Sequence, residues 1–166
     1  MSDKSKRITV ENAEILYSNF SGVERPNNPA GKRNFCLVIP NDIVEELKAD
    51  GWNVKPKKMR DPDDDPVYFL QIEIGFNNPK YPVRIIARTE NGDNKMSLDE
   101  HTVNCLDWAE IISVEKVVIN PRLWTNAAGE ERIKAYLRTL KVVIDDEDYE
   151  EISEGGADID EDDVPF

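Results

Sequence analysis

The sequence predicts a mainly β protein: a small barrel of five or six strands with one or two short helices and a disordered acidic tail. Three observations lead to this prediction. Apolar and polar residues alternate with a period of two along much of the chain, and only one segment carries clear start and stop signals of a helix. Residues 145–166 hold acidic side chains but no basic ones. The 166 residues are enough for about one domain.

The alternation is clearest in residues 67–76. The residues on one side of this segment are all apolar: Tyr68, Leu70, Ile72, Ile74 and Phe76. Those on the other side are mixed: Val67, Phe69, Gln71, Glu73 and Gly75. One wholly apolar side is typical of a half-buried strand. The same pattern predicts strands over residues 8–17, 34–39, 83–88, 111–120 and 133–144.

One helix is expected over residues 41–50. Asn41 and Asp42 can cap its N-terminus, with Glu45 three residues after Asp42. Gly51 is the kind of residue that ends a helix in the left-handed conformation. A second short turn is expected over residues 98–108.

Acidic residues gather at the C-terminus. Residues 145–166 contain 12 of the 34 acidic residues, so residues 1–144 carry 22 acidic against 21 basic side chains and are nearly neutral. A segment of low hydrophobicity with one sign of charge does not bury enough apolar surface to fold. We therefore expect a folded domain of residues 1–144 and a disordered tail of residues 145–166 that binds proteins.

Several protein classes are excluded at this stage. No apolar run approaches the roughly 20 residues that a membrane-spanning helix needs, and the polar first residues do not form a signal peptide. Cys36 and Cys105 lie in apolar stretches and are too few for a disulfide framework. The sequence therefore favours a reduced cytoplasmic protein without a membrane partner.

The predicted last strand carries the first functional pattern. Lys134, Tyr136 and Arg138 lie on one side of it, and apolar residues lie on the other. Single-stranded nucleic acid is bound by such patterns, because cations contact the phosphates while bases stack on an aromatic ring. A solvated strand face would show the same pattern, and this alternative stays open.

Further basic and aromatic residues lie near this strand in the expected fold. Arg84 and Arg88 share one face of another strand, and Lys32 and Arg33 precede the strand at 34–39. The predicted nucleic-acid-binding residues are Lys32, Arg33, Arg84, Arg88, Arg122, Trp124, Lys134, Tyr136 and Arg138. The loops 18–33 and 120–131 would flank the site.

The aromatic residues divide by their expected roles. Trp124, in the loop 120–131, is either a stacking platform or an anchor for that loop. Trp52 and Trp108 are favoured as core residues, although stacking is not excluded for either. For Phe69, on the mixed side of its strand, stacking and core packing stay open.

The tail ends on an apolar aromatic residue after an acidic run. Its expected partner-binding residues are Asp160, Glu161, Asp162, Asp163, Val164, Pro165 and Phe166. Such an end suits a partner with a hydrophobic pocket ringed by basic side chains. A tail that only solubilises the chain is the alternative.

This ending resembles the acidic tip of bacterial single-stranded-DNA-binding proteins. Residues 31–39, 119–124 and 133–140 resemble segments of the bacteriophage single-stranded-DNA-binding proteins. The resemblance implies an OB-fold barrel that coats single strands in replication, recombination and repair in the host-cell cytoplasm. It also implies that the tail recruits a polymerase, helicase or primase; a homodimer is left open. The nearly neutral body departs from a uniformly basic DNA-binding surface.

Two other functions are alternatives to this interpretation. An acidic protein that mimics DNA would spread acidic residues over its folded surface, whereas here the excess lies in the tail. A metal-dependent nuclease could use Asp61, Asp63, Asp64 and Asp65, but no further ligand pattern follows them.

Catalytic and metal-ligand patterns are otherwise weak. His101, the only histidine, is four residues before Cys105, and Cys36 could join them for zinc, but no second Cys/His pair exists. The sequence has no glycine-rich phosphate loop. We therefore expect no enzymatic activity, no catalytic residue, no cofactor and no metal.

Overall fold

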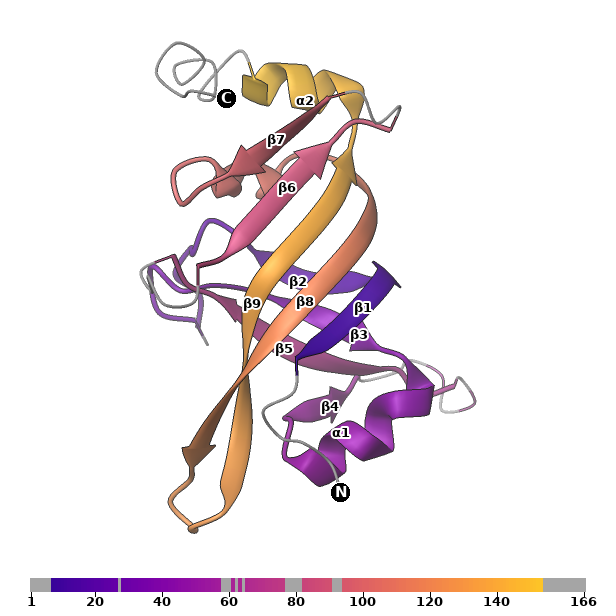
Figure 1. Ribbon diagram of the computed structural model, residues 1–166, viewed down its shortest axis with the longest axis vertical. Helices are drawn as coiled ribbons and strands as arrows, with labels where there is room; N and C mark the ends of the chain where they lie inside the picture. The colour runs from indigo at the N-terminus through magenta and orange to yellow at the C-terminus, as the bar shows by residue number, and fades with distance from the viewer. Residues whose placement is uncertain are drawn as a thin grey trace.

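The computed structural model describes residues 7–26, 28–57, 61, 63, 65–76, 82–90 and 94–153. Nine strands among these residues form one mixed sheet (Figure 1). They are β1 (Ile8–Ala13), β2 (Ile15–Asn19), β3 (Arg33–Ile39), β4 (Val54–Pro56), β5 (Tyr68–Ile74), β6 (Arg84–Arg88), β7 (Lys95–Leu98), β8 (Ile111–Thr125) and β9 (Glu131–Ile144). The helices are the 3-10 turns η1 (Asn41–Ile43) and η2 (Val103–Asp107) and the α-helices α1 (Val44–Asp50) and α2 (Asp146–Ile152).

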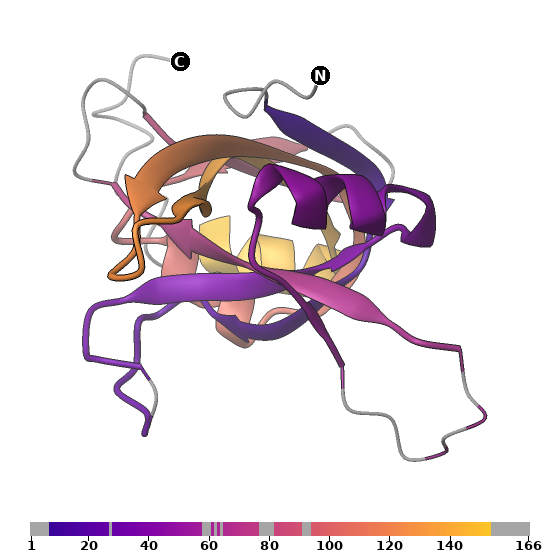
Figure 2. The same ribbon diagram turned by 90° about the horizontal axis from the view of Figure 1, so that it is seen from below.

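The sheet follows the hydrogen-bonded order β1-β8-β9-β5-β3-β2, with β4 added to β5, and β6 and β7 added beside β9. The β5–β9 and β6–β9 pairs are parallel, and the other pairs are antiparallel. The two ends of the order, β1 and β2, are not paired with each other but are joined by Glu14 alone. The strands therefore curve around a common core. Figure 2 shows the curved arrangement of the strands from below. The fold is mainly β and OB-fold-like, as predicted.

All six predicted strands are present, but their bounds differ. The segment 8–17 is divided into β1 and β2, and the short β4 and β7 were not predicted. β8 continues to Thr125, so most of the expected loop 120–131 is a pair of strands. Pro121 is tolerated there because β1 pairs with β8 only as far as Ile119, so no strand of the described residues pairs with that edge of β8. We call residues 120–136 the β8–β9 arm (Figure 1).

The predicted helix is present as η1 followed by α1. Gly51 ends α1 with φ +106°, and its backbone N–H donates to Lys48 O at 3.1 Å. The predicted side-chain cap from Asn41 or Asp42 is wrong, because neither η1 nor α1 has a side-chain cap hydrogen bond. The chain instead enters through a 3-10 turn after Pro40. The second expected turn, over residues 98–108, contains η2.

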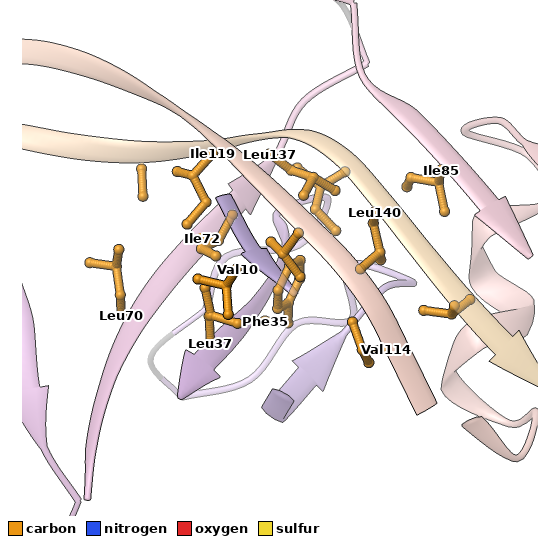
Figure 3. Close-up of a cluster of buried hydrophobic side chains, with 14 of the residues drawn as sticks. Val10, Phe35, Leu37, Leu70, Ile72, Ile85, Val114, Ile119, Leu137 and Leu140 are labelled. Atoms are coloured by element: carbon orange, nitrogen blue, oxygen red, sulfur yellow. The ribbon is translucent and has the colours of Figure 1, made fainter. Parts of the chain in front are cut away.

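The core lies inside the curved sheet that the strands form. Side chains from β1, β3, β5, β6, β8 and β9 point toward one another there, as the labelled residues of Figure 3 show. Trp52 belongs to this core and is 5% exposed, as favoured from the sequence. Trp108 does not, because it is 53% exposed. The interpretation of Trp108 as a core residue is therefore wrong.

The chain continues as a folded structure beyond β9. α2 begins after Asp145, whose carboxylate accepts a hydrogen bond from the backbone N–H of Glu147, and its Ile152 is buried. Asp148 also accepts from the backbone N–H of Glu110 at 2.7 Å. The expectation of disorder from residue 145 is therefore wrong for residues 146–152. Helix formation follows from Asp145 as an N-cap and from acidic residues in the first turn, which favour a helix N-terminus.

Candidate nucleic-acid interface

A groove of about 1000 Å³ opens between the β8–β9 arm, β5 and the segment from α1 to β4. Its lining includes five basic side chains and one acidic side chain. These are Lys32, Lys48, Arg122, Arg132, Lys134 and Glu73. Trp124 and Tyr136 line the same groove. Local clustering thus produces a basic surface on a body that is nearly neutral overall.

The β8–β9 arm brings four of these residues to one side. Arg122 is the register partner of Lys134, and Trp124 is the register partner of Arg132. Directly opposed residues in an antiparallel pair lie on the same face of the sheet. The arm therefore presents a row in which cations and an aromatic ring are interspersed.

The tip of the arm is held by Asn126. Its side-chain Oδ1 accepts from the backbone N–H groups of Ala128 at 3.0 Å and Glu130 at 2.9 Å. Gly129 supplies the positive φ of +81° that this turn requires. Since the tip fixes the register of both strands, it also fixes the pairing of Trp124 with Arg132.

Tyr136 lies at the base of the arm, between two cations. The guanidinium carbon of Arg122 is 5.8 Å from the ring centre, and Lys134 Nζ is 5.7 Å from it. Both distances are within the range of cation–π attraction. The ring is therefore flanked by two positive charges, which can attract phosphate groups.

Glu73 connects the two sides of the groove. Its Oε1 is 3.4 Å from Lys32 Nζ and 3.2 Å from Lys134 Nζ. Glu73 is the parallel register partner of Tyr136, so this carboxylate lies next to the ring. Such partly exposed ion pairs contribute little to stability, about 0–1 kcal/mol. They hold the two lysines toward the groove, where a phosphate can replace the carboxylate as their partner.

Lys32 reaches this position because the β2–β3 connection is braced by Asn28. The Asn28 side-chain amide donates to Lys32 O at 3.0 Å and to Val23 O at 3.1 Å. Asn28 Oδ1 in turn accepts from Asn34 Nδ2 at 2.7 Å. The end of this connection is thus fixed against β3.

The floor of the groove depends on Gly51. Its carbonyl accepts from the backbone N–H of Ile133 at 3.0 Å, which docks the end of α1 on the start of β9. A Cβ at this position would lie 3.2 Å from Glu131 O, and the positive φ would strain any other residue. The docking places Trp52 beneath the groove and Lys48 at its rim; Lys48 Nζ lies 4.6 Å from the ring centre of Tyr68.

Arg84 and Arg138 lie outside this groove. They line a smaller pocket of about 340 Å³ together with Ser97 and Thr139. Arg138 follows Tyr136 by two residues on the same strand, so the pocket continues the outer side of β9 beyond the groove. Among the described residues, neither arginine has an ion-pair partner.

Arg33 and Arg88, also predicted from the sequence, are engaged elsewhere. Arg33 donates to Phe20 O and Glu100 O, both at 2.9 Å. Arg88 binds Glu115 through two hydrogen bonds of 2.6 and 2.9 Å, and these raise the pKa of Arg88 and lower that of Glu115. Both arginines connect parts of the fold, and the structure does not bring them to the groove.

Sequence reasoning missed several lining residues. Lys48 and Trp52 reach the groove because α1 docks on β9, and no local sequence pattern indicates this docking. Arg132 continues the alternation of Lys134 and Tyr136, so a strand starting two residues earlier than predicted would have included it. Gln71 and Glu73 lie on the polar side of a correctly predicted strand, which is a usable signal.

The cysteines and acidic residues show no metal site. Among the described residues, no group of three or more His, Cys, Asp or Glu side chains is placed to hold a metal ion. Burial raises the pKa of the Cys105 thiol to about 12 and raises that of Cys36, so both stay protonated near neutral pH. Asp64 lies outside the described residues. No helix in the described part of the chain is long and apolar enough to cross a membrane.

Comparison with protein families decides the relationship of this chain. The model of a family described as "Putative phage ssDNA-binding domain" matches residues 2–165. The chain belongs to this family. The resemblance to bacteriophage single-stranded-DNA-binding proteins is thereby confirmed.

Two solved structures of phage proteins are similar to this chain. The single-stranded DNA-binding protein from bacteriophage Enc34, solved as a C-terminal truncation, has a TM-score of 0.51 and 16% identity, covering 84% of this chain and 86% of that chain. The protein gp2.5, a single-stranded DNA-binding protein encoded by bacteriophage T7, has a TM-score of 0.41 and 16% identity, covering 88% and 93%. No curated protein sequence matches the chain.

The predicted partner-binding residues fall outside the described structure. Residues 154–166, which include the whole set from Asp160 to Phe166, are not among the described residues.

Proposed function

We propose that this protein binds single-stranded DNA, without strong sequence preference, in the groove between the β8–β9 arm and α1. The observation that carries the proposal is the arrangement around Tyr136. An aromatic ring lies beside Arg122 and Lys134, within a groove that has five basic side chains and one acidic one. The family and the Enc34 protein, described as a single-stranded-DNA-binding protein, support the same function.

The residues divide by chemistry. Tyr136 and Trp124 offer ring faces on which any base can stack, and base–aromatic stacking contributes about 1–3 kcal/mol per base. The phosphates would contact Lys32, Arg122, Arg132 and Lys134, and beyond the groove Arg84 and Arg138. We assign no DNA contact to Arg33 or Arg88, because their guanidinium groups are hydrogen-bonded within the fold. No catalytic step is needed, and we propose a non-enzymatic role.

A basic groove also weighs against a protein that mimics DNA. A mimic would present acidic side chains to a DNA-binding enzyme, whereas five of the six charged residues lining this groove are basic.

Titration with labelled oligo(dT) and with duplex DNA of equal length tests the proposal. The wild-type protein should bind the single strand more tightly than the duplex. Tyr136→Ala should weaken binding to oligo(dT) by about 5- to 150-fold, because one stacked base is lost. Unchanged affinity in a Tyr136→Ala protein that unfolds at the wild-type urea concentration would contradict the proposal.

We further propose that the C-terminal residues 154–166 recruit a replication polymerase, helicase or primase in the host-cell cytoplasm. The acidic run would attract a basic surface, and the Phe166 ring would enter an apolar pocket there. The same polyanion would compete with DNA for the groove.

Deletion of residues 154–166 tests both parts, since it leaves α2 in place. The deletion should tighten oligo(dT) binding at low salt and have less effect at high salt, because salt screens the competing charges. Phe166→Ala should weaken binding to the polymerase of the same phage, measured by surface plasmon resonance, and leave oligo(dT) binding unchanged. Unchanged polymerase binding would contradict recruitment through this end.

A further inference from the structure

Tyr17 is an exposed aromatic residue with a strained backbone. It is 59% exposed, and its φ of +50° lies in the left-handed region that non-glycine residues rarely adopt. The strain coincides with a register shift between β2 and β3 that falls between Leu16 and Asn19. Such irregularities redirect a side chain, and here the redirected ring is left on the outer surface. Core packing therefore does not explain the position of Tyr17.

The Tyr17 ring meets a second aromatic residue, Phe69 of β5. The ring centres are 5.9 Å apart and the planes are at 75°, an edge-to-face pair. Phe69 precedes the buried Leu70, so by alternation it points to the outer face of β5. The two side chains form an exposed aromatic corner over β2 and β5, and stacking for Phe69 was one of the roles left open by the sequence.

A cation lies beside this corner. Lys55 of β4 is the register partner of Phe69. Directly opposed residues of an antiparallel pair lie on the same face of the sheet, so Lys55 lies beside Phe69 on the outer face. Lys55 has no ion-pair partner among the described residues. An aromatic pair beside an unneutralised cation repeats the chemistry found at Tyr136.

The corner is continuous with the groove. Gln71 lines the groove and follows Phe69 by two residues on the same face of β5, about 7 Å along the strand. Asn53 and Val54 line the groove from the other side, and Lys55 is the next residue along β4. A single strand that leaves the groove past Gln71 therefore reaches Lys55 and the two rings next.

We propose that Tyr17, Phe69 and Lys55 form a second base-stacking subsite for single-stranded DNA, which extends the groove across the outer face of β5. This inference rests on the proposed function of the groove. In it, a base stacks on the exposed Tyr17 ring, Phe69 holds that ring in place, and Lys55 contacts the adjoining phosphate. Strands long enough to span both sites gain affinity from this subsite, and short strands do not.

A series of labelled oligo(dT) strands of about 4 to 16 nucleotides, measured by fluorescence anisotropy, tests the inference. Tyr17→Ala should bind the shortest strands like the wild type and lose about fivefold or more in affinity for the longest. Tyr17→Phe should retain the wild-type affinity at every length. Trp108→Ala is the matched control, because Trp108 is similarly exposed but does not line the groove.

Lys55→Gln is an independent test, because this substitution leaves the strained backbone at Tyr17 unchanged. For long strands it should lower the slope of log affinity against log salt by about 0.7, and for short strands it should leave the slope unchanged. Wild-type behaviour of both Tyr17→Ala and Lys55→Gln at all lengths would overturn the subsite, as would an equal loss at all lengths. Failure of the groove itself is distinguishable, because Tyr136→Ala would then have no effect on the shortest strands.

Discussion

The two ends of β9 differ in sequence pattern and in surroundings. At its start, Arg132, Lys134 and Tyr136 lie along the groove. At its end, Val142, Val143 and Ile144 are all buried. Alternation at the start leaves one polar face, whereas a continuous apolar run is typical of a strand that is buried on both faces. The elements that pack against each end match this difference.

Neighbouring elements account for the contrast. Along the arm, β9 pairs with β8, and within the described residues no strand pairs with the other edge of β8 there. The face that carries Arg122, Lys134 and Tyr136 lines the groove. Near its end, β9 lies between β6 and β8, and α2 follows with Ile152 buried in the same core (Figure 1). One arginine near each end shows a related difference in charge pairing. Arg88, beside the end of β9, is paired with Glu115, whereas Arg122 in the arm has no ion-pair partner among the described residues.

The largest expected effect is on stability, at the buried C-terminal end of β9. Ile152→Ala should lower the free energy of unfolding by about 2–4 kcal/mol, because it leaves a cavity where α2 meets the core. Urea denaturation measures this loss. Ile112→Ala is the matched control, since Ile112 is exposed and should change stability by less than about 0.5 kcal/mol. Equal stability of the two variants would show that α2 does not complete the core.

The next largest effect is on DNA binding, at the start of β9 in the β8–β9 arm. Trp124→Ala should weaken oligo(dT) binding by about 1–3 kcal/mol if its ring stacks on a base. Trp108→Ala should leave affinity unchanged, although the two side chains are comparably exposed, at 48% and 53%. Anisotropy of a labelled oligonucleotide measures both affinities. If the two variants lose the same affinity, the loss comes from removing any exposed tryptophan and not from a contact in the groove.

The strands were predictable because a half-buried strand has one apolar and one polar face, which appear in the sequence as alternating residues. The alternation in β5 located the buried Leu70 and Ile72 and the outward Glu73 correctly. The β8–β9 arm and the C-terminal segment were harder to predict. Pro121 suggested a loop, but β8 is an edge there and loses no inter-strand hydrogen bond. The acidic composition after residue 144 concealed α2, whose stability depends on burying Ile152 and not on average hydrophobicity.

The site was only half predictable for a similar reason. Lys134 and Tyr136 were found together because they share a strand, and Arg122 joined them through the cross-strand register of a hairpin. The roles of Arg33 and Arg88 depended on long-range partners, Phe20 O and Glu115, which sequence spacing does not reveal. Basic residues on a strand face therefore indicated a binding surface without showing which charges were already neutralised.

A smaller effect concerns the charge of a lysine in the groove. Lys134→Gln should lower the slope of log affinity against log salt by about 0.7, because one phosphate contact is lost. Lys95→Gln on β7, outside the groove, should leave the slope unchanged. Titrations at several salt concentrations give both slopes. Identical slopes for the two variants would mean that the groove lysine does not contact a phosphate.

The smallest effect belongs to the ion pair near the buried C-terminal end of β9. The hydrogen bonds from Arg88 lower the pKa of Glu115, so the folded state favours the carboxylate. The resulting stability is present above the ordinary glutamate pKa of 4.5 and is lost as the pH falls through the lower pKa of the folded protein. Glu115→Gln should therefore be less stable than the wild type at pH 7, and the difference should shrink as the solution is acidified.

The side chains of Arg88 and Glu115 are 30% and 37% exposed, so solvent screening keeps this loss below that of Ile152→Ala. Urea denaturation of both proteins at neutral and acidic pH measures the difference, and oligo(dT) affinity at neutral pH should be equal. A stability difference that does not change with pH would show that Glu115 acts through packing and not through its charge. A loss of DNA affinity in Glu115→Gln would instead show that the C-terminal end of β9 communicates with its start in the β8–β9 arm.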